Sequence, residues 1–289
     1  MVLRVLPNVW LSLALGSLWL PARTSGGGWP LRLSVSAGWL GLSIVHAYAT
    51  GIVSPIGILV IVAFGLLCFY SSRKRLATAA TILFSLALMA HVVPGFANLL
   101  VARDAVLSPG AVPYTLYLNF DKAQIGFFVL AFGPPLLMSR VEWMTMLRAA
   151  LPRVLVVILV LMACALSIGQ VRVDVKWPEI FPTWAWSNLL FTCASEEALF
   201  RGVIQRWLQG GSTQTSATST RGVAGLAIAA LIFGAAHFAG GMASIVLATV
   251  AGLGYGWIFW RTDRIEASIL AHFLVNTAHI LGFTYPALA

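Results

Sequence analysis

Apolar residues run in long stretches along most of the chain, with short polar breaks between them. A helix needs about 20 residues to cross the hydrocarbon core of a bilayer, and slightly shorter apolar runs can form partial spans. The pattern predicts an all-α fold, a polytopic transmembrane helical bundle of about 8–10 spans. The candidate spans are residues 5–20, 34–50, 54–70, 76–95, 125–139, 154–170, 183–205, 223–240, 242–260 and 265–283.

Two of these runs need comment. Residues 125–139 contain Pro134 and Pro135, so we expect a broken or re-entrant helix there. The first run follows Arg4 and has the form of a signal peptide, but it has no clean small-x-small cleavage site. We therefore expect residues 5–20 to be retained as a helix.

The composition excludes most classes of soluble protein. Of the 289 residues, 60% are hydrophobic and 9% are charged, whereas soluble domains have roughly 45–50% apolar and about 25% charged residues. Too few charged side chains are present to cover a soluble surface. The composition therefore excludes soluble enzymes, coiled coils, disordered proteins and disulfide scaffolds, and predicts a multi-pass integral membrane protein. We expect it in a bacterial-type plasma membrane.

The net charge of +9 comes from 18 basic and 9 acidic residues. The basic residues occupy the short breaks between apolar runs, which is typical of signals that set the orientation of membrane helices next to anionic lipid. We therefore expect the lipid bilayer, and no nucleic acid, as a partner. The three cysteines lie singly in apolar runs and predict small core residues.

Two adjacent carboxylates, Glu196 and Glu197, lie well inside the apolar run 183–205. A charge at the centre of a bilayer costs about 2.5–3.5 kcal/mol on insertion scales, so such a pair needs compensation. Arg201 follows Glu197 by four residues and shares its helix face. Glu196 is rotated by about 100° from Glu197 and is available for another role.

Two later runs carry polar side chains at the same four-residue spacing. Phe233 precedes His237, and His272 precedes Asn276, so each pair shares one face of its helix. With the glutamates, these side chains are suited to activating a water molecule. The positive-inside rule places the more basic set of loops in the cytoplasm. Straight helices would then place Glu196 and His272 roughly 10–14 Å, and His237 roughly 20 Å, from the cytoplasmic ends of their spans. A later helix start or a break near Gly234 would reconcile these depths.

Together these residues resemble the motifs of the CPBP intramembrane proteases, also called the Abi or CAAX-protease family. Glu196 to Arg201 matches EExxxR, Phe233 to His237 matches FxxxH, and His272 to Asn276 matches HxxxN. The resemblance covers roughly residues 183–285. It divides the chain into N-terminal transmembrane helices of unassigned role, residues 1–180, and a CPBP-like intramembrane protease core, residues 181–289.

The resemblance implies an endopeptidase that hydrolyses a peptide bond of a membrane-associated protein or peptide. Glu196 would act as the general base with His237, and Glu197 and Arg201 would form a supporting charge pair. His272 and Asn276 would stabilise the oxyanion. The site would be either glutamic or metal-dependent, because Glu196, His237 and His272 are suitable ligands for zinc but no HExxH spacing demands the metal.

Other functions and the substrate stay open on the sequence alone. A non-catalytic membrane adaptor or immunity protein would bind a peptide in the same cavity, and its function would survive Glu196→Gln. A proton-coupled transporter would use Glu196 and Glu197 as relay carboxylates. A prenylated CAAX protein, a C-terminal sorting tag, a signal-peptide remnant and a bacteriocin precursor are all compatible substrates.

Overall fold

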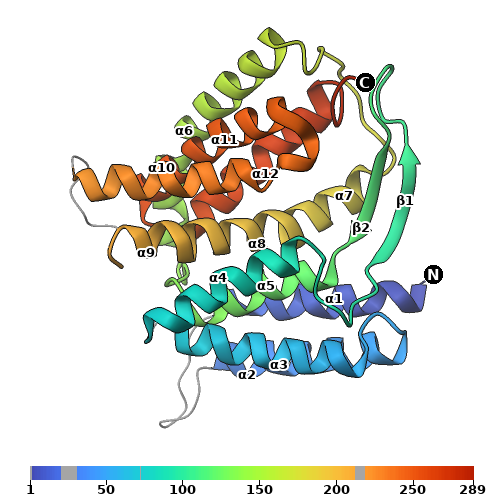
Figure 1. The fold of residues 1–289 in the computed structure, drawn as a ribbon, viewed down its shortest axis with the longest axis vertical. Helices are drawn as coiled ribbons and strands as arrows, with labels where there is room; N and C mark the ends of the chain where they lie inside the picture. Colours follow the sequence, from blue (N-terminus) through green and yellow to red (C-terminus); the bar gives the residue numbers. More distant parts are fainter. Residues whose placement is uncertain (1, 21–30, 72, 212–218) are drawn as a thin grey trace. The chain divides into compact units, whose positions relative to one another are not determined.

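The computed structural model describes residues 2–20, 31–71, 73–211 and 219–289, and in them it confirms the all-α class (Figure 1). Each of the ten predicted apolar runs contains a helix. The helices outside the run 183–205 are α1 (Val2–Gly16), α2 (Leu31–Ala49), α3 (Pro55–Ser71), α4 (Arg75–Met89), α5 (Phe120–Phe132), α6 (Arg140–Ser167), α10 (Thr220–Ala235), α11 (Gly241–Thr262) and α12 (Ile265–Gly282). As expected from Pro134 and Pro135, α5 ends at Phe132 and residues 133–139 are not helical.

Three helical stretches in the described residues are long and apolar enough to cross a membrane. They are Arg140–Ser167, Phe238–Thr262 and Ile265–Gly282. Shorter apolar helices cover Pro55–Ser71, Arg75–Met89 and Thr220–Ala235. The chain is thus an integral membrane protein, while the number of crossings stays a prediction.

A small sheet interrupts the helices in a region that the apolar pattern left unassigned. Strands β1 (Leu99–Ala105) and β2 (Tyr114–Leu118) pair with each other. The hydroxyl of Thr115 accepts a hydrogen bond from the backbone N–H of Asp104 and donates one to its carboxylate. Leu116 and Leu118 of β2 are buried, so the sheet turns part of its apolar surface into the protein.

The chain forms two compact units that interleave along the sequence. Unit 1 comprises residues 1–100, 117–143 and 190–203, and unit 2 comprises residues 101–116, 144–189 and 204–289. The stretch that carries EExxxR therefore clusters with the N-terminal helices. The predicted boundary between residues 180 and 181 stays a prediction.

Besides residues 190–203, unit 1 contains helices α1 to α5, with α5 in contact with α1, α3 and α4. Aromatic rings fill the space between them. The ring of Phe64 on α3 meets Phe84 of α4 and Phe128 of α5 edge-on, at centroid distances of 5.5 and 6.0 Å. Helix α5 therefore lies at the centre of this unit, and nearly all of its side chains are buried.

Unit 2 contains the consecutive helices α10, α11 and α12, and α11 contacts both of the others. Helix α6 also packs on α11, because the guanidinium of Arg153 lies over the ring of Trp257. After α12, the chain end runs beside residues 170–176. Backbone hydrogen bonds join Asp174 and Lys176 to Gly282 and Leu281 in the last turn of α12. Beyond the helix, Thr284 and Leu288 donate to the carbonyl oxygens of Arg172 and Gln170, so this strap and the C-terminal segment hold each other in place.

Candidate active site

The glutamate motif lies on a helix that is locally unwound on both sides of it. Residues 181–208 form α7 (Phe181–Ser187), a π-helical segment (Asn188–Cys193), α8 (Ala194–Glu197), a second π-helical segment (Ala198–Gln205) and α9 (Arg206–Leu208). π-Helical turns are rare and frequently occur at functional sites. The straight span expected over 183–205 is therefore one continuous but irregular helix.

Glu197 and Arg201 form the ion pair that their spacing predicts. The Nε of Arg201 lies 3.1 Å from Oε2 of Glu197, and both side chains are 0% exposed. A buried carboxylate and a buried guanidinium would each be costly alone, and the pairing removes most of that cost. The supporting role that the family resemblance implies for this pair stays a prediction.

Glu196 has a different cationic partner, which the sequence did not indicate. The Nζ of Lys122, in the first turn of α5, donates to Oε1 of Glu196 at 2.6 Å. The two side chains are 11% and 6% exposed. The only signal in the sequence was the need of a second buried carboxylate for compensation, and nothing in the spacing pointed to a residue 74 positions earlier.

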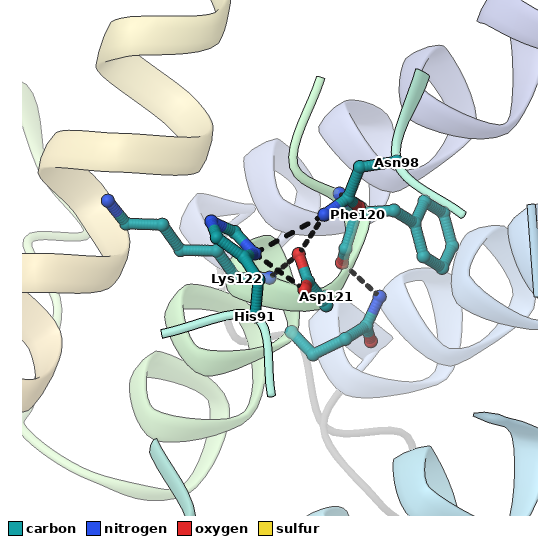
Figure 2. Close-up of polar contacts among 6 residues, drawn as sticks. His91, Asn98, Phe120, Asp121 and Lys122 are labelled. Carbon is teal, nitrogen blue, oxygen red and sulfur yellow. Dashed lines mark hydrogen bonds and ion pairs between the residues drawn. The ribbon is translucent and has the colours of Figure 1, made fainter. Parts of the chain in front are cut away.

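A cluster of polar side chains fixes the start of α5 next to Lys122 (Figure 2). The Asp121 carboxylate accepts hydrogen bonds from Nδ1 of His91 at 2.7 Å, from Nδ2 of Asn98 at 2.8 Å and from the backbone N–H of Lys122 at 2.7 Å. The Oδ1 of Asn98 accepts from the N–H of Phe120 at 2.8 Å. Two N–H groups of the first turn, which a helix leaves unpaired, are thereby satisfied.

In unit 2, the FxxxH motif spans the end of a helix. Helix α10 ends at Ala235, and His237 has non-helical dihedral angles, so the break considered near Gly234 is present. The Nδ1 of His237 donates to the carbonyl oxygen of Phe233 at 2.8 Å, and the two rings lie 4.8 Å apart. Because Nδ1 carries the proton in this bond, Nε2 of the neutral ring is a hydrogen-bond acceptor.

Aromatic rings hold the second histidine. The ring of Tyr255, from α11, stacks on His272 with centroids 4.7 Å apart and an interplanar angle of 18°. Phe233 meets the same imidazole edge-on at 5.7 Å. His272 is buried, and Phe233 thus contacts both histidines of the motifs. The sequence did not single out Tyr255, because a tyrosine in an apolar span is equally typical of packing.

Asn276, one turn after His272 on α12, contacts the motif helix. Its Nδ2 donates to Oδ1 of Asn188 at 3.3 Å. Asn188 begins the first π-helical segment and was not among the predicted site residues. An amide in an apolar span was a signal that could have singled it out.

The predicted site residues therefore form two groups, one in each unit. Glu196, Glu197 and Arg201 lie in unit 1, whereas His237, His272 and Asn276 lie in unit 2. In the part of the chain that the structure describes, no group of three or more His, Cys, Asp or Glu side chains is arranged to hold a metal ion. The grouping of Glu196, His237 and His272 as zinc ligands stays a prediction.

Comparison with known families gives a match in the C-terminal part of the chain. Residues 178–278 match the family model described as Type II CAAX prenyl endopeptidase Rce1-like. This stretch is about a third of the chain, and it contains all three motifs. The match confirms the resemblance to the CPBP family over these residues. No curated protein and no solved structure matches the chain.

Proposed function

We propose that this protein is an intramembrane endopeptidase that hydrolyses a peptide bond of a membrane-associated protein or peptide. The observation that carries the proposal is the family match over residues 178–278, in which the Glu197–Arg201 ion pair is buried and the two motif histidines are held by one phenylalanine. A serviceable peptidase site needs a base, an acid and oxyanion donors, and the motif residues supply all three.

In the proposed reaction, the Glu196 carboxylate takes a proton from a water molecule whose oxygen attacks the scissile carbonyl carbon. The Nε2 of His237 accepts a hydrogen bond from the same water. Donors from His272 and Asn276 stabilise the oxyanion of the tetrahedral intermediate. Collapse of the intermediate breaks the C–N bond, and the proton held by Glu196 passes to the leaving amine.

The supporting residues have separate tasks in this scheme. Glu197 and Arg201 neutralise each other and fix the helix turn that carries Glu196. The hydrogen bond to the Phe233 carbonyl fixes the tautomer and ring orientation of His237. Each task is a matter of orientation, which matters because small errors in the placement of reacting groups lower rates strongly.

For the substrate, we propose the class that the family description names, a protein with a prenylated C-terminal CAAX motif. The apolar surroundings of a membrane protein suit a lipid-modified chain end. Multi-pass insertion in a bacterial-type plasma membrane remains part of the proposal.

The test uses the full-length protein reconstituted in phosphatidylethanolamine–phosphatidylglycerol vesicles. A farnesylated CAAX peptide, the same peptide without the farnesyl group, and a version with serine for the cysteine are compared by mass spectrometry. The native protein should release the C-terminal tripeptide from the farnesylated probe, and Glu196→Gln should not. Glu142→Gln is the matched control, because that carboxylate accepts from the backbone of Met138 and Ser139 instead.

The same assay addresses the two alternatives within the proposal. Equal cleavage of all three probes would keep the peptidase and remove the prenyl specificity. Cleavage by Glu196→Gln at the native rate would contradict Glu196 as the base. The proposed steps use side chains alone, so 1,10-phenanthroline should leave the rate unchanged, and a loss that zinc restores would contradict this part.

A further inference from the structure

We propose that Lys122, outside the family-matched region, is a positioning residue of the active site that pairs with the Glu196 carboxylate and holds it in place. This inference rests on the proposed function, because it assigns Glu196 the role of base. It also gives the N-terminal part of the chain a task in catalysis. The juxtaposition that carries it is the contact of 2.6 Å between Nζ of Lys122 and Oε1 of Glu196.

The buried charge of Glu196 is compensated by Lys122. A carboxylate buried to this degree is costly unless a cation compensates its charge. An ammonium within hydrogen-bond distance supplies that charge and a strong contact that fixes the carboxylate. Arg201 is already engaged by Glu197 through Nε, so Lys122 gives the second carboxylate a cation of its own.

The position of Lys122 in its helix is unusual for a lysine. It lies in the first turn of α5, where the helix dipole disfavours a cation. Helix stability therefore does not account for a lysine at this position, whereas the carboxylate of Glu196 does. In Figure 2 its side chain extends away from the cluster around Asp121.

Helix α5 packs tightly on the helix that carries Glu196. Residues 117–143 and 190–203 belong to the same compact unit, and α5 contacts α8 directly. One turn after Lys122, the N–H of Gly126 donates to Oγ of Ser195 at 3.2 Å. A Cβ at Gly126 would lie 2.9 Å from that oxygen, so only glycine permits this approach without a shift. The neighbour of Glu196 is thereby held against α5.

The hydrogen bonds of Asp121 hold the start of α5 in place. They fix the first turn of α5 to His91 and Asn98, so the backbone from which Lys122 projects is anchored on one side and packed on Ser195 on the other. Lys122 thus reaches Glu196 from α5, a different helix from the one that carries the motif. A positioning role follows from this arrangement.

The experiment measures kcat and KM of the full-length protein in the vesicles described above, with the farnesylated CAAX peptide as the probe. Lys122→Met should lower kcat at least about tenfold, which is part of the roughly hundredfold to ten-thousandfold that general-base catalysis contributes, and change KM little. Lys122→Arg restores the charge and should recover most of the lost rate. The matched control is Lys176→Met, which removes another lysine of low exposure from an ion pair, with Asp174 at 3.0 Å.

A double-mutant cycle keeps the test decisive if turnover or folding is affected. The melting temperatures of Lys122→Met, Glu196→Gln and the double variant are measured in detergent. We expect the double variant to melt higher than the sum of the two single losses predicts, because each single change strands one buried partner. This readout requires no substrate.

The outcomes separate the two proposals. If Lys122→Met and Lys176→Met keep the same kcat while Glu196→Gln is inactive, the inference is overturned and the proposed function stands. If the native protein does not cleave the probe, the proposed function fails on that substrate, and additive melting shifts would then overturn the pairing itself. A loss of rate that Lys122→Arg does not recover would reject the role of the charge.

Discussion

At the scale of single residues, the two adjacent glutamates differ in their partners. Glu197 pairs within its own helix with Arg201, and Glu196 pairs with Lys122 from α5. Two carboxylates side by side in an apolar segment are thus each matched by a cation. The rotation of about one hundred degrees between neighbours on a helix is what sends them to different partners.

The burial of the Glu197–Arg201 pair leads to a prediction for stability. Arg201→Met should lower the free energy of unfolding by about 3–5 kcal/mol, because it leaves a buried carboxylate without its partner. The matched control is Arg206→Met. Arg206 contacts Asp263 at the same 3.1 Å, but those side chains are 23% and 47% exposed, so its loss should cost at most about 1 kcal/mol.

Unfolding of both variants in detergent, followed by circular dichroism, measures the difference. An equal decrease in the free energy of unfolding for Arg201→Met and Arg206→Met would show that burial does not set the strength of the Glu197–Arg201 ion pair.

Tyr255 carries a prediction for activity. Its ring is 1% exposed and stacks on His272, so it should fix the imidazole plane. Tyr255→Leu removes the stacked ring and should lower kcat by roughly tenfold to a hundredfold, as expected for a displaced reacting group. Tyr255→Phe keeps the ring and should retain most of the rate. Steady-state cleavage of the farnesylated probe compares them, and equal rates for Tyr255→Leu and the native protein would reject a role for the stack.

At the scale of elements, the apolar pattern predicted where the helices lie but not how they end or unwind. Each of the ten runs contains a helix, because burial of backbone groups in an apolar medium demands helical hydrogen bonding. The π-helical segments around Glu196 and the strands β1 and β2 were not predicted. Their conformation depends on tertiary packing, which hydrophobic periodicity does not report.

The candidate site shows the same division. The pairs with four-residue spacing were predictable, since i and i+4 positions share a helix face, and Glu197 with Arg201 confirms it. Lys122, Tyr255 and Asn188 were not, because each comes from a different element and reaches its partner only through the fold. The catalytic roles of the motif residues remain predictions.

Packing between α10 and α11 gives a prediction at the element scale. A Cβ at Gly234, between the two residues of FxxxH, would clash with Oγ1 of Thr249 and lie 2.8 Å from the carbonyl oxygen of Ile245. Gly234→Ala should therefore destabilise the protein by about 1–3 kcal/mol and shift His237. The control is Gly38→Ala in α2, where a Cβ meets nothing within 4 Å.

In the control, alanine replaces glycine inside a helix, which should leave stability unchanged or raise it by up to about 1 kcal/mol. Thermal unfolding in detergent compares the variants. If both glycines accept alanine equally, the close approach of α10 and α11 at Gly234 is not present in solution.

At the scale of the whole molecule, the chain end is tied to the strap of residues 170–176 within unit 2. Side-chain contacts of Asp174 add to the backbone hydrogen bonds at Asp174 and Lys176. A hydrogen bond from Ser108, and then one from Lys176, lower the pKa of Asp174 from its ordinary value of 3.8. Because the pKa of Asp174 is lower in the folded than in the unfolded protein, its ionised carboxylate stabilises the fold at pH values above the ordinary pKa of 3.8.

This stabilisation should be lost as the pH falls through the lowered pKa of Asp174. Hydrogen exchange of the backbone amides in residues 171–176, corrected for intrinsic rates, should then increase at acidic pH. Asp174→Asn removes the titrating group, so its exchange should show no such pH dependence. An unchanged exchange rate in the native protein at acidic pH would count against the contact.

The account as a whole depends on Glu196 acting as the base of a membrane endopeptidase. The most direct measurement compares host membranes that carry the native protein with membranes that carry Glu196→Gln, and maps all protein N- and C-termini by mass spectrometry. Glutamine keeps the shape of the side chain and removes its basicity. The account predicts that at least one membrane-associated protein accumulates uncut only with the variant. Identical termini, together with an unchanged physiological effect of the protein, would contradict it.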